Sequence, residues 1–393
     1  MKFSTTLLAA GSAVAVVAVA TAGVATAAPS PATAGGKHAA KVCSAPARGM
    51  AACLNQVLVN NSTGKPAVTG TPAGLNPADI RSAYALTASS SGGRTVAIVD
   101  AYNDPTAESD LGVYRSQFGL SSCTTSNGCF RKVSQTGSTT SLPATDAGWA
   151  TEISLDLDMV SAACPDCKIL LVEASSSSFA NLGTAVNYAA SQAGVVAISN
   201  SYGGSDSAQT SAYNHPGIAI TASTGDAGYG VESPASFPDV VAVGGTSLSR
   251  ASNTRGWTES AWSGAGSGCS TINAKPTWQT SVTQCSKKAN ADVSAVADPN
   301  TGVSVYDSTS YQGSVGWQVY GGTSASSPII ASVYALSGNT AGYPASYTWA
   351  HASGLNDVTS GSNGTCSTTV WCHAGVGWDG PTGLGTPKGT SAF

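Results

Sequence analysis

Charged side chains are scarce in this sequence of 393 residues, because Asp, Glu, Lys and Arg make up only 10% of it, whereas about a quarter is usual in globular proteins. Together with 42% hydrophobic residues, this argues against disorder, which requires high charge and few apolar groups. The formal net charge of −4 argues against nucleic acid or an anionic membrane as the main partner. At acid pH at most 17 Lys and Arg and 4 His side chains are positive, so self-repulsion stays limited.

Long hydrophobic runs are also missing, except at the N-terminus. Lys2 precedes an Ala-, Val- and Leu-rich stretch at 7–24, and Ala25-Thr26-Ala27 matches the A-x-A signal for cleavage after Ala27. This pattern predicts a signal peptide at 1–27 and a secreted, extracellular protein. A membrane anchor is the alternative, but the run is only moderately apolar and a cleavage site follows it at once. No later stretch is long and apolar enough to span a bilayer, so no membrane contact is expected after cleavage.

The ten cysteines fall into pairs that are close in sequence, and an even number in an exported chain predicts disulfides. Cys164-Pro-Asp-Cys167 has the C-x-x-C form of a redox or zinc site. A zinc site would need a second matching pair with a nearby His, which the sequence does not place there, so a staple after a helix is the better interpretation. The predicted disulfides are Cys43–Cys53, Cys123–Cys129, Cys164–Cys167, Cys269–Cys285 and Cys366–Cys372.

From about residue 74 onward, continuous apolar runs alternate with helical stretches, the first helix being capped by Asn76 before Pro77. Such runs predict strands buried on both faces. The alternation predicts an α/β fold: one large domain at 74–393 with a mainly parallel sheet and helices on both faces. Residues 28–73 are expected to form a short N-terminal extension and linker. The predicted strands are 95–100, 169–172, 195–198, 218–221 and 240–243; the predicted helices are 106–118, 149–163, 179–193 and 324–337.

The sharpest chemical signal is Gly-Gly-Thr-Ser-Ala-Ser-Ser-Pro at 321–328. It delivers Ser324 to the start of an apolar helix, where free N–H groups and the positive end of the helix dipole suit a developing oxyanion. Ser324 as a simple N-cap is the alternative. The residues alone leave these two interpretations about even.

Carboxylates occur at two further places. Glu152 and Asp156 are four residues apart and therefore share one helix face. A solvated acidic face is the usual explanation, but this helix is otherwise nearly uncharged. Asp226 lies in the Gly-flanked turn 223–228 after a predicted strand, where active sites of parallel sheets form. An ordinary turn residue is the alternative there.

Together, and in this order, these segments resemble the sedolisin (serine-carboxyl peptidase) family, which has a subtilisin-like fold; the resemblance covers roughly 74–387. Gly-Thr-Ser-x-x-x-Pro is similar to the serine motif of the subtilisin clan, but none of the four His residues has the His-Gly-Thr-His context of a subtilisin base. The resemblance implies Ser324 as nucleophile, Glu152 as general base, Asp156 as its orienting carboxylate and Asp226 as an oxyanion donor. It also implies that residues 199–204 line the substrate cleft.

The resemblance implies an endopeptidase that hydrolyses protein and peptide substrates at acid pH through an acyl-enzyme, and we expect a monomer. A carboxylate with an unperturbed pKa of about 4.3 can still act as a base at acid pH, whereas a His with a pKa of about 6.5 is already protonated there. A catalytically weak or inactive binding protein of the same fold is the alternative, because the Gly-rich cleft segment of the family is altered at 262–269. A neutral protease with a His base and a structural surface protein are less favoured.

The resemblance also implies one structural Ca²⁺ near the C-terminus. Its ligands would be the carboxylates of Asp357 and Asp379 and the carbonyls of Val358, Gly375 and Gly377. Hard oxygen ligands suit Ca²⁺, although two Asp residues in Gly-rich loops are more often turn residues. Members of the family usually carry a long folded prodomain, for which residues 28–71 are too few.

Overall fold

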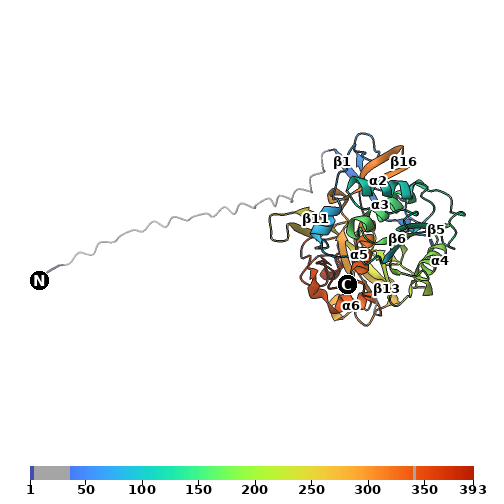
Figure 1. Cartoon of the computed structure of the whole chain (residues 1–393). Coiled ribbons are helices and arrows are strands. Elements are labelled where there is room, and N and C mark those ends of the chain that lie inside the picture. Colours follow the sequence, from blue (N-terminus) through green and yellow to red (C-terminus); the bar gives the residue numbers. More distant parts are fainter. Residues whose placement is uncertain (4–35, 340–341) are drawn as a thin grey trace. The chain divides into compact units, whose positions relative to one another are not determined.

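The computed structural model describes residues 1–3, 36–339 and 342–393 (Figure 1). The predicted signal peptide at 1–27 lies outside these residues, apart from its first three. The description below concerns the folded unit that begins after residue 35. In the described part of the chain, no helix combines the length and the apolar character that crossing a membrane requires.

A central eight-stranded sheet forms the frame of the fold, with strand order β12-β11-β9-β7-β4-β6-β5 and β15 paired to β11. All of its pairings are parallel except that of β12 with β11. The mainly parallel sheet predicted from the apolar runs is therefore confirmed. The strands are β4 (Thr95–Ala101), β5 (Phe130–Ser134), β6 (Lys168–Ala174), β7 (Val195–Asn200), β9 (Ala219–Ser223), β11 (Val241–Arg250), β12 (Trp257–Ala261) and β15 (Val293–Val296).

Helices cover both faces of this sheet, as predicted. Val96 and Ile98 of β4 pack with α3 (Ala147–Ala163) and α5 (Thr323–Ser337), whereas Ala97 and Val99 pack with α4 (Phe179–Ala190). Successive side chains of a strand point to opposite faces, so a strand covered on both faces must be apolar throughout. The remaining helices are α1 (Pro77–Ala83), α2 (Ala107–Gln117) and α6 (Pro344–Ala350).

Helix ends follow local capping groups. Asn76 caps α1 in a capping box with Asp79, as predicted. Helix α3 begins two residues earlier than expected, because the side chain of Asp146 accepts a hydrogen bond from the N–H of Trp149. The predicted helix at 324–337 is α5, whose N-cap is Gly322. Ser324 is therefore not the N-cap of this helix, and that alternative is wrong.

Residues of the expected N-terminal extension form three strands that join the body: β1 (Lys37–Lys41), β2 (Ala52–Cys53) and β3 (Gln56–Asn60). Strand β3 pairs with β1 and with β17, and β2 pairs with β8. The other short strands are β8 (Tyr202–Ser205), β10 (Glu232–Ser233), β13 (Gly268–Ala274), β14 (Lys287–Asn290), β16 (Val303–Tyr311), β17 (Ser314–Gly321), β18 (Leu355–Asn356) and β19 (Thr386–Pro387).

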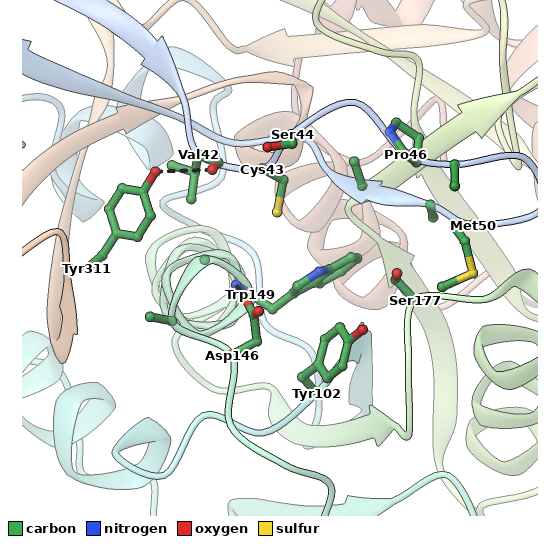
Figure 2. A pocket seen from close by; sticks show the side chains of 15 residues that line it. Val42, Cys43, Ser44, Pro46, Met50, Tyr102, Asp146, Trp149, Ser177 and Tyr311 are labelled. Carbon is green, nitrogen blue, oxygen red and sulfur yellow. Dashed lines mark hydrogen bonds between the residues drawn. The ribbon is translucent and has the colours of Figure 1, made fainter.

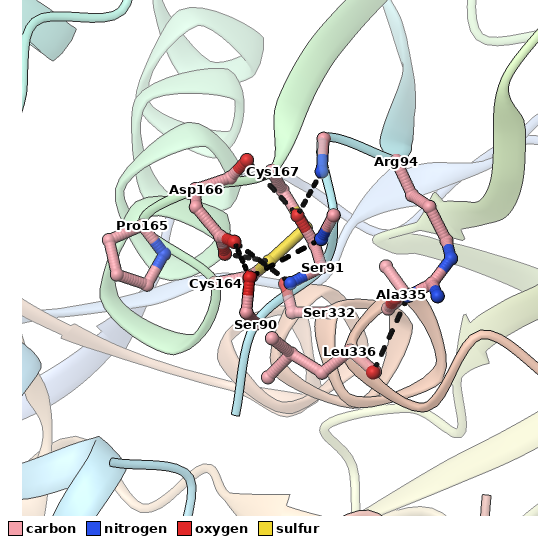
Figure 3. The surroundings of a disulfide bond; sticks show 12 residues. Ser90, Ser91, Arg94, Cys164, Pro165, Asp166, Cys167, Ser332, Ala335 and Leu336 are labelled. Carbon is pink, nitrogen blue, oxygen red and sulfur yellow. Dashed lines mark hydrogen bonds between the residues drawn. A yellow bond between two sulfur atoms is a disulfide. The ribbon is translucent and has the colours of Figure 1, made fainter. Parts of the chain in front are cut away.

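All five predicted disulfides are present, and they pair all ten cysteines. The Cys164–Cys167 bond closes the turn that ends α3 (Figure 3). In this turn Asp166 accepts hydrogen bonds from the hydroxyl of Ser90 at 2.6 Å and the N–H of Ser91 at 2.9 Å. The C-x-x-C disulfide therefore closes the turn after α3, as expected, and Asp166 within this turn binds the neighbouring loop at Ser90 and Ser91.

Candidate active site

Strand β17 ends at Gly321, and Ser324 lies in the first turn of α5. Between the strand and the helix, Gly322 has a backbone conformation that only glycine permits. Gly322 has φ of +99°, and a Cβ there would lie 2.1 Å from the Leu54 carbonyl oxygen and 2.6 Å from Asp226 Oδ2. Ser324 is buried, and its hydroxyl donates to the carbonyl of Ser201 at 3.3 Å. The helix start thus places this hydroxyl beside the segment 199–204, which was expected to line the cleft.

Helix α3 presents its two predicted carboxylates to the interior rather than to solvent. Glu152 and Asp156 are both 0% exposed, so the alternative of a solvated acidic face is wrong. Burial and the charge of Asp100 raise the pKa of Glu152 well above its usual range, and the neighbouring Ser324 hydroxyl lowers it. Burial, Asp100 and Glu152 likewise raise the pKa of Asp156. A proton is therefore held among these buried carboxylates.

Asp100 is a third member of this cluster that the sequence analysis did not single out. It is the penultimate residue of β4, is fully buried, and neither of its carboxylate oxygens has a hydrogen-bond partner among the described residues. Burial, with the charge of Glu173 added, raises its pKa to about 8. The available signal was a carboxylate at the carboxyl end of an otherwise apolar strand, which is where active sites of parallel sheets lie.

Asp226 occupies the loop after β9 and faces the start of α5. Its Oδ1 accepts hydrogen bonds from the N–H and the hydroxyl of Thr323, both at 2.8 Å. Burial raises its pKa to about 7, even though the bonds from Thr323 lower it. At acid pH this carboxyl is therefore neutral and carries a proton that it can donate.

The altered Gly-rich segment 262–269 supports the Asp226 loop. The N–H of Gly266 donates to the carbonyl of Gly225 at 2.8 Å. A Cβ on Gly266 would lie 1.9 Å from the carbonyl oxygen of Thr224, so this close approach requires glycine. The segment therefore keeps a backbone contact with the loop that carries Asp226.

The predicted calcium ligands come together at the C-terminal loops. The N–H of Gly377 donates to Asp357 Oδ2 at 2.9 Å, and that of Gly375 donates to Asp379 Oδ2 at 3.2 Å. The carbonyls of Val358, Gly375 and Gly377 accept no hydrogen bond from any described residue. Nowhere in the described ranges do three or more His, Cys, Asp or Glu side chains form a metal-binding group. Two carboxylates and free carbonyls nevertheless fit the oxygen-rich coordination of Ca²⁺.

Comparison with known proteins places this geometry in a family. The model of the Subtilase family matches residues 134–367. Kumamolisin of Bacillus sp. (strain MN-32) is 29% identical over 362 residues, which are 81% of this chain and 63% of kumamolisin. Sedolisin of Pseudomonas sp. (strain 101) is 34% identical over 177 residues, 40% of this chain and 29% of that protein. The chain thus spans less than two thirds of the length of these relatives.

A solved structure agrees over most of the chain. Pseudomonas sedolisin, a serine-carboxyl proteinase complexed with two molecules of pseudo-iodotyrostatin, superimposes with a TM-score of 0.67 and 27% identity. The match covers 81% of this chain and 96% of that structure. The fold is therefore subtilisin-like, as the resemblance implied. The chain belongs to the subtilase family, and within it to the sedolisin type.

Proposed function

We propose that this protein is a serine-carboxyl endopeptidase that cleaves protein and peptide substrates at acid pH. The observation that carries the proposal is the burial of Glu152 beside the Ser324 hydroxyl: both residues are 0% exposed where α3 contacts α5. A buried carboxylate next to a helix-start hydroxyl is the arrangement of a nucleophile with its base. The family relationship supports the same assignment.

In the proposed reaction, Ser324 Oγ attacks the peptide carbonyl while Glu152 accepts its proton. Because the pKa of Glu152 is raised, only the ionised fraction of this carboxyl acts as the base at acid pH. Asp156 and Asp100 are proposed as positioning residues, because they belong to the same buried cluster: the charge of Asp100 raises the pKa of Glu152, and that of Glu152 raises the pKa of Asp156. The N–H of Ser324 and the neutral carboxyl of Asp226 then stabilise the oxyanion. Glu152 returns the proton to the leaving nitrogen, and water releases the acyl group from Ser324.

A pH profile of hydrolysis tests this function. We expect wild-type protein to degrade an acid-denatured protein substrate at about pH 4 and to lose activity as the pH rises through about 7, where Asp226 ionises. Ser324→Ala, at equal concentration, is the control. Equal turnover by both proteins would contradict the proposal, and a wild type without any acylation by a serine-directed inhibitor would favour an inactive binding protein.

The finer predictions from the sequence remain part of the proposal. We propose export with removal of 1–27, an N-terminal extension at 28–73, a catalytic domain at 74–393 and action as a monomer. The A-x-A site and the paired cysteines support export.

We also propose that the C-terminal loops hold one structural Ca²⁺ through Asp357, Val358, Gly375, Gly377 and Asp379. A metal bound by the native state alone stabilises it by mass action. Chelation of the purified protein is therefore expected to lower its melting temperature by several degrees, and added Ca²⁺ to restore it. Asp357→Asn should abolish this response. An unchanged melting temperature, with no calcium in elemental analysis, would contradict the site.

The buried carboxyls predict greater stability at acid pH. The pKa of Asp100 is about 8 in the folded chain, against about 3.9 when unfolded. Below about pH 4 the Asp100 carboxyl is protonated in both the folded and the unfolded state, so it does not change the free energy of unfolding. Between about pH 4 and 8 it ionises only in the unfolded state, so the free energy of unfolding falls by up to about 1.4 kcal/mol per pH unit.

The melting temperature at constant calcium is therefore expected to fall as the pH rises from 4 to 8. Asp100→Asn removes this ionisation and should flatten the slope. A melting temperature that rises across the same range would show that Asp100 is ionised in the folded protein.

A further inference from the structure

Glu173 of β6 is a buried carboxylate to which the proposed reaction gives no role. It is 0% exposed and lies directly opposite Asp100 in the parallel pairing of β6 with β4. Leu171 and Ile98, two residues earlier in these strands, both pack in the core on the α3 side of the sheet. Because side chains alternate between the two faces of a sheet, Glu173 and Asp100 point to this side as well. The two carboxyls therefore lie on neighbouring strands beneath the helix that carries Glu152.

The two oxygens of the Glu173 carboxylate have different surroundings. Oε1 accepts a hydrogen bond from the N–H of Asp104 at 3.0 Å and lies 3.7 Å from Nζ of Lys132. Oε2 is buried and has no hydrogen-bond partner among the described residues, and the same is true of both carboxylate oxygens of Asp100. Buried polar atoms without partners are costly. A single proton between Asp100 and Oε2 of Glu173 would satisfy both carboxyls.

Lys132 of β5 favours the charged form of Glu173 over that of Asp100. Its Nζ donates to the carbonyl of Asp104 at 2.6 Å and to Oδ1 of Asn103 at 2.9 Å, which holds the ammonium beside Glu173. Burial raises the pKa of Glu173 to about 7, although the charge of Lys132 lowers it. Burial and the charge of Glu173 raise the pKa of Asp100 to about 8. As the pH rises, the proton therefore leaves Glu173 before it leaves Asp100.

Ionisable groups face this pair of carboxyls from the elements around it, and nearly all of them are acids. In the described part of the chain, Lys132 is the one cation that contacts the pair. A negative charge on Asp100 therefore adds directly to the repulsion within the buried cluster. The acids are Glu152 and Asp156 of α3, Tyr202 of β8 and Asp104 after β4, with Asp110, Asp158 and Asp307 acting on Asp104 or on one another.

We propose that Glu173 is a positioning residue of the peptidase reaction: with Lys132 beside it, Glu173 keeps a proton on Asp100. The carboxylate charge then forms on Glu152 instead. The proposal rests on the peptidase function above. A charged Asp100 raises the pKa of Glu152 and thereby keeps the base protonated. A neutral Asp100 removes this repulsion, so Glu152 is ionised in a larger fraction of molecules and can take the proton from Ser324.

Glu173→Gln tests this role through the pH dependence of turnover. Glutamine keeps the size of the side chain and an oxygen for the N–H of Asp104, but it cannot carry the charge. The pKa of Asp100 should then fall by about one to two units. We expect kcat/KM for denatured protein to match the wild type near about pH 4, where Asp100 is protonated in both proteins. Between about pH 6 and 7 it should be about three- to tenfold lower. An equal loss at every pH would indicate a structural defect and overturn the proposal.

Two further changes test whether the effect passes through Asp100. Lys132→Gln removes the cation that favours the charged form of Glu173, so it should act in the same direction as Glu173→Gln. In Asp100→Asn no carboxyl can ionise at this position, so adding Glu173→Gln should leave the pH dependence unchanged. A loss of the same size with and without Asp100 would overturn the proposal.

Asp146→Asn is the matched control. Asp146 is an exposed carboxylate at the N-cap of α3, and it lines a pocket of about 560 Å³ together with Tyr102 and Trp149 (Figure 2). Asparagine caps a helix about as well as aspartate does. The change therefore removes a charge from the same helix, outside the buried cluster, and its kcat/KM should follow the wild type from about pH 4 to 7. A loss above about pH 6 as large as that of Glu173→Gln would overturn the proposal.

Infrared difference spectra separate this inference from the peptidase function, because they require no turnover. In a Ser324→Ala background, the band of the protonated Asp100 carboxyl is identified by its absence in Asp100→Asn. We expect this band to persist at about pH 7 and to disappear at that pH when Glu173→Gln is added. A band unchanged by Glu173→Gln overturns the inference, whatever the activity. The expected loss of the band in a protein whose wild type is inactive at every pH overturns the peptidase function and leaves the hold of Glu173 on the Asp100 proton standing.

Discussion

Ser324→Ala and Glu152→Ala are each expected to lower kcat about ten-thousandfold or more, and the double variant should be little worse than either. A nucleophile without its base and a base without its nucleophile fail for the same reason, because one proton transfer needs both groups. The structure supports this coupling, since the Ser324 hydroxyl acts on the pKa of Glu152. Steady-state turnover of denatured protein at about pH 4 measures the effect.

Ser332→Ala is the matched control for this experiment. It removes a hydroxyl of the same helix whose hydrogen bond goes to the Pro328 carbonyl at 2.8 Å, within α5. Its turnover should stay near that of the wild type. The melting temperature of every variant is measured first, to verify that each is folded like the wild type. Two single losses that multiply in the double variant would show that Ser324 and Glu152 act independently.

Asp226→Asn is expected to lower kcat about a hundredfold, the usual scale for one oxyanion donor. Asparagine keeps an oxygen for the bonds from Thr323 but offers an amide in place of the neutral carboxyl. The wild type should lose activity as the pH rises through about 7, because the carboxyl then ionises and stops donating. The variant cannot ionise at this position.

The residual activity of Asp226→Asn should therefore lack this alkaline decline, unless another group titrates in the same range. The side chain of Gln56 donates to Asp226 Oδ2 at 3.3 Å. Gln56→Ala removes this amide but no proposed catalytic group, and it is the control. Near-wild-type turnover with an unchanged pH profile in Asp226→Asn would assign Asp226 an ordinary turn role.

The central sheet was predictable because its strands are covered on both faces. In a strand such as β4 the residues from Val96 to Val99 are then all apolar, and that leaves a continuous run in the sequence. Strands β16 and β17 leave no such mark, because polar residues such as Asp307 and Gln318 interrupt their apolar positions. Strand β17 also pairs with the distant β3, a contact that the sequence near β17 does not reveal.

The residues of the candidate site likewise fall into those that a sequence pattern revealed and those that only the fold brings together. Glu152 and Asp156 were found because their spacing on an otherwise nearly uncharged helix is unusual, and Ser324 because of its Gly-rich context. Asp100 was missed because a single carboxylate after an apolar run has no spacing that marks it. Two contacts of the site were also missed, because neutral residues carry no chemical signal. Only the fold brings the Leu54 carbonyl to the Ser324 N–H and the Asn55 amide to Glu152.

Turnover of Glu152→Gln at acid pH tests the central claim most directly, because the change keeps size and hydrogen bonding but removes the proton acceptor. With folding verified by the melting temperature, the account predicts a loss of at least about a thousandfold in kcat. Wild-type turnover in Glu152→Gln would contradict it, since another group would then have to take the proton from Ser324.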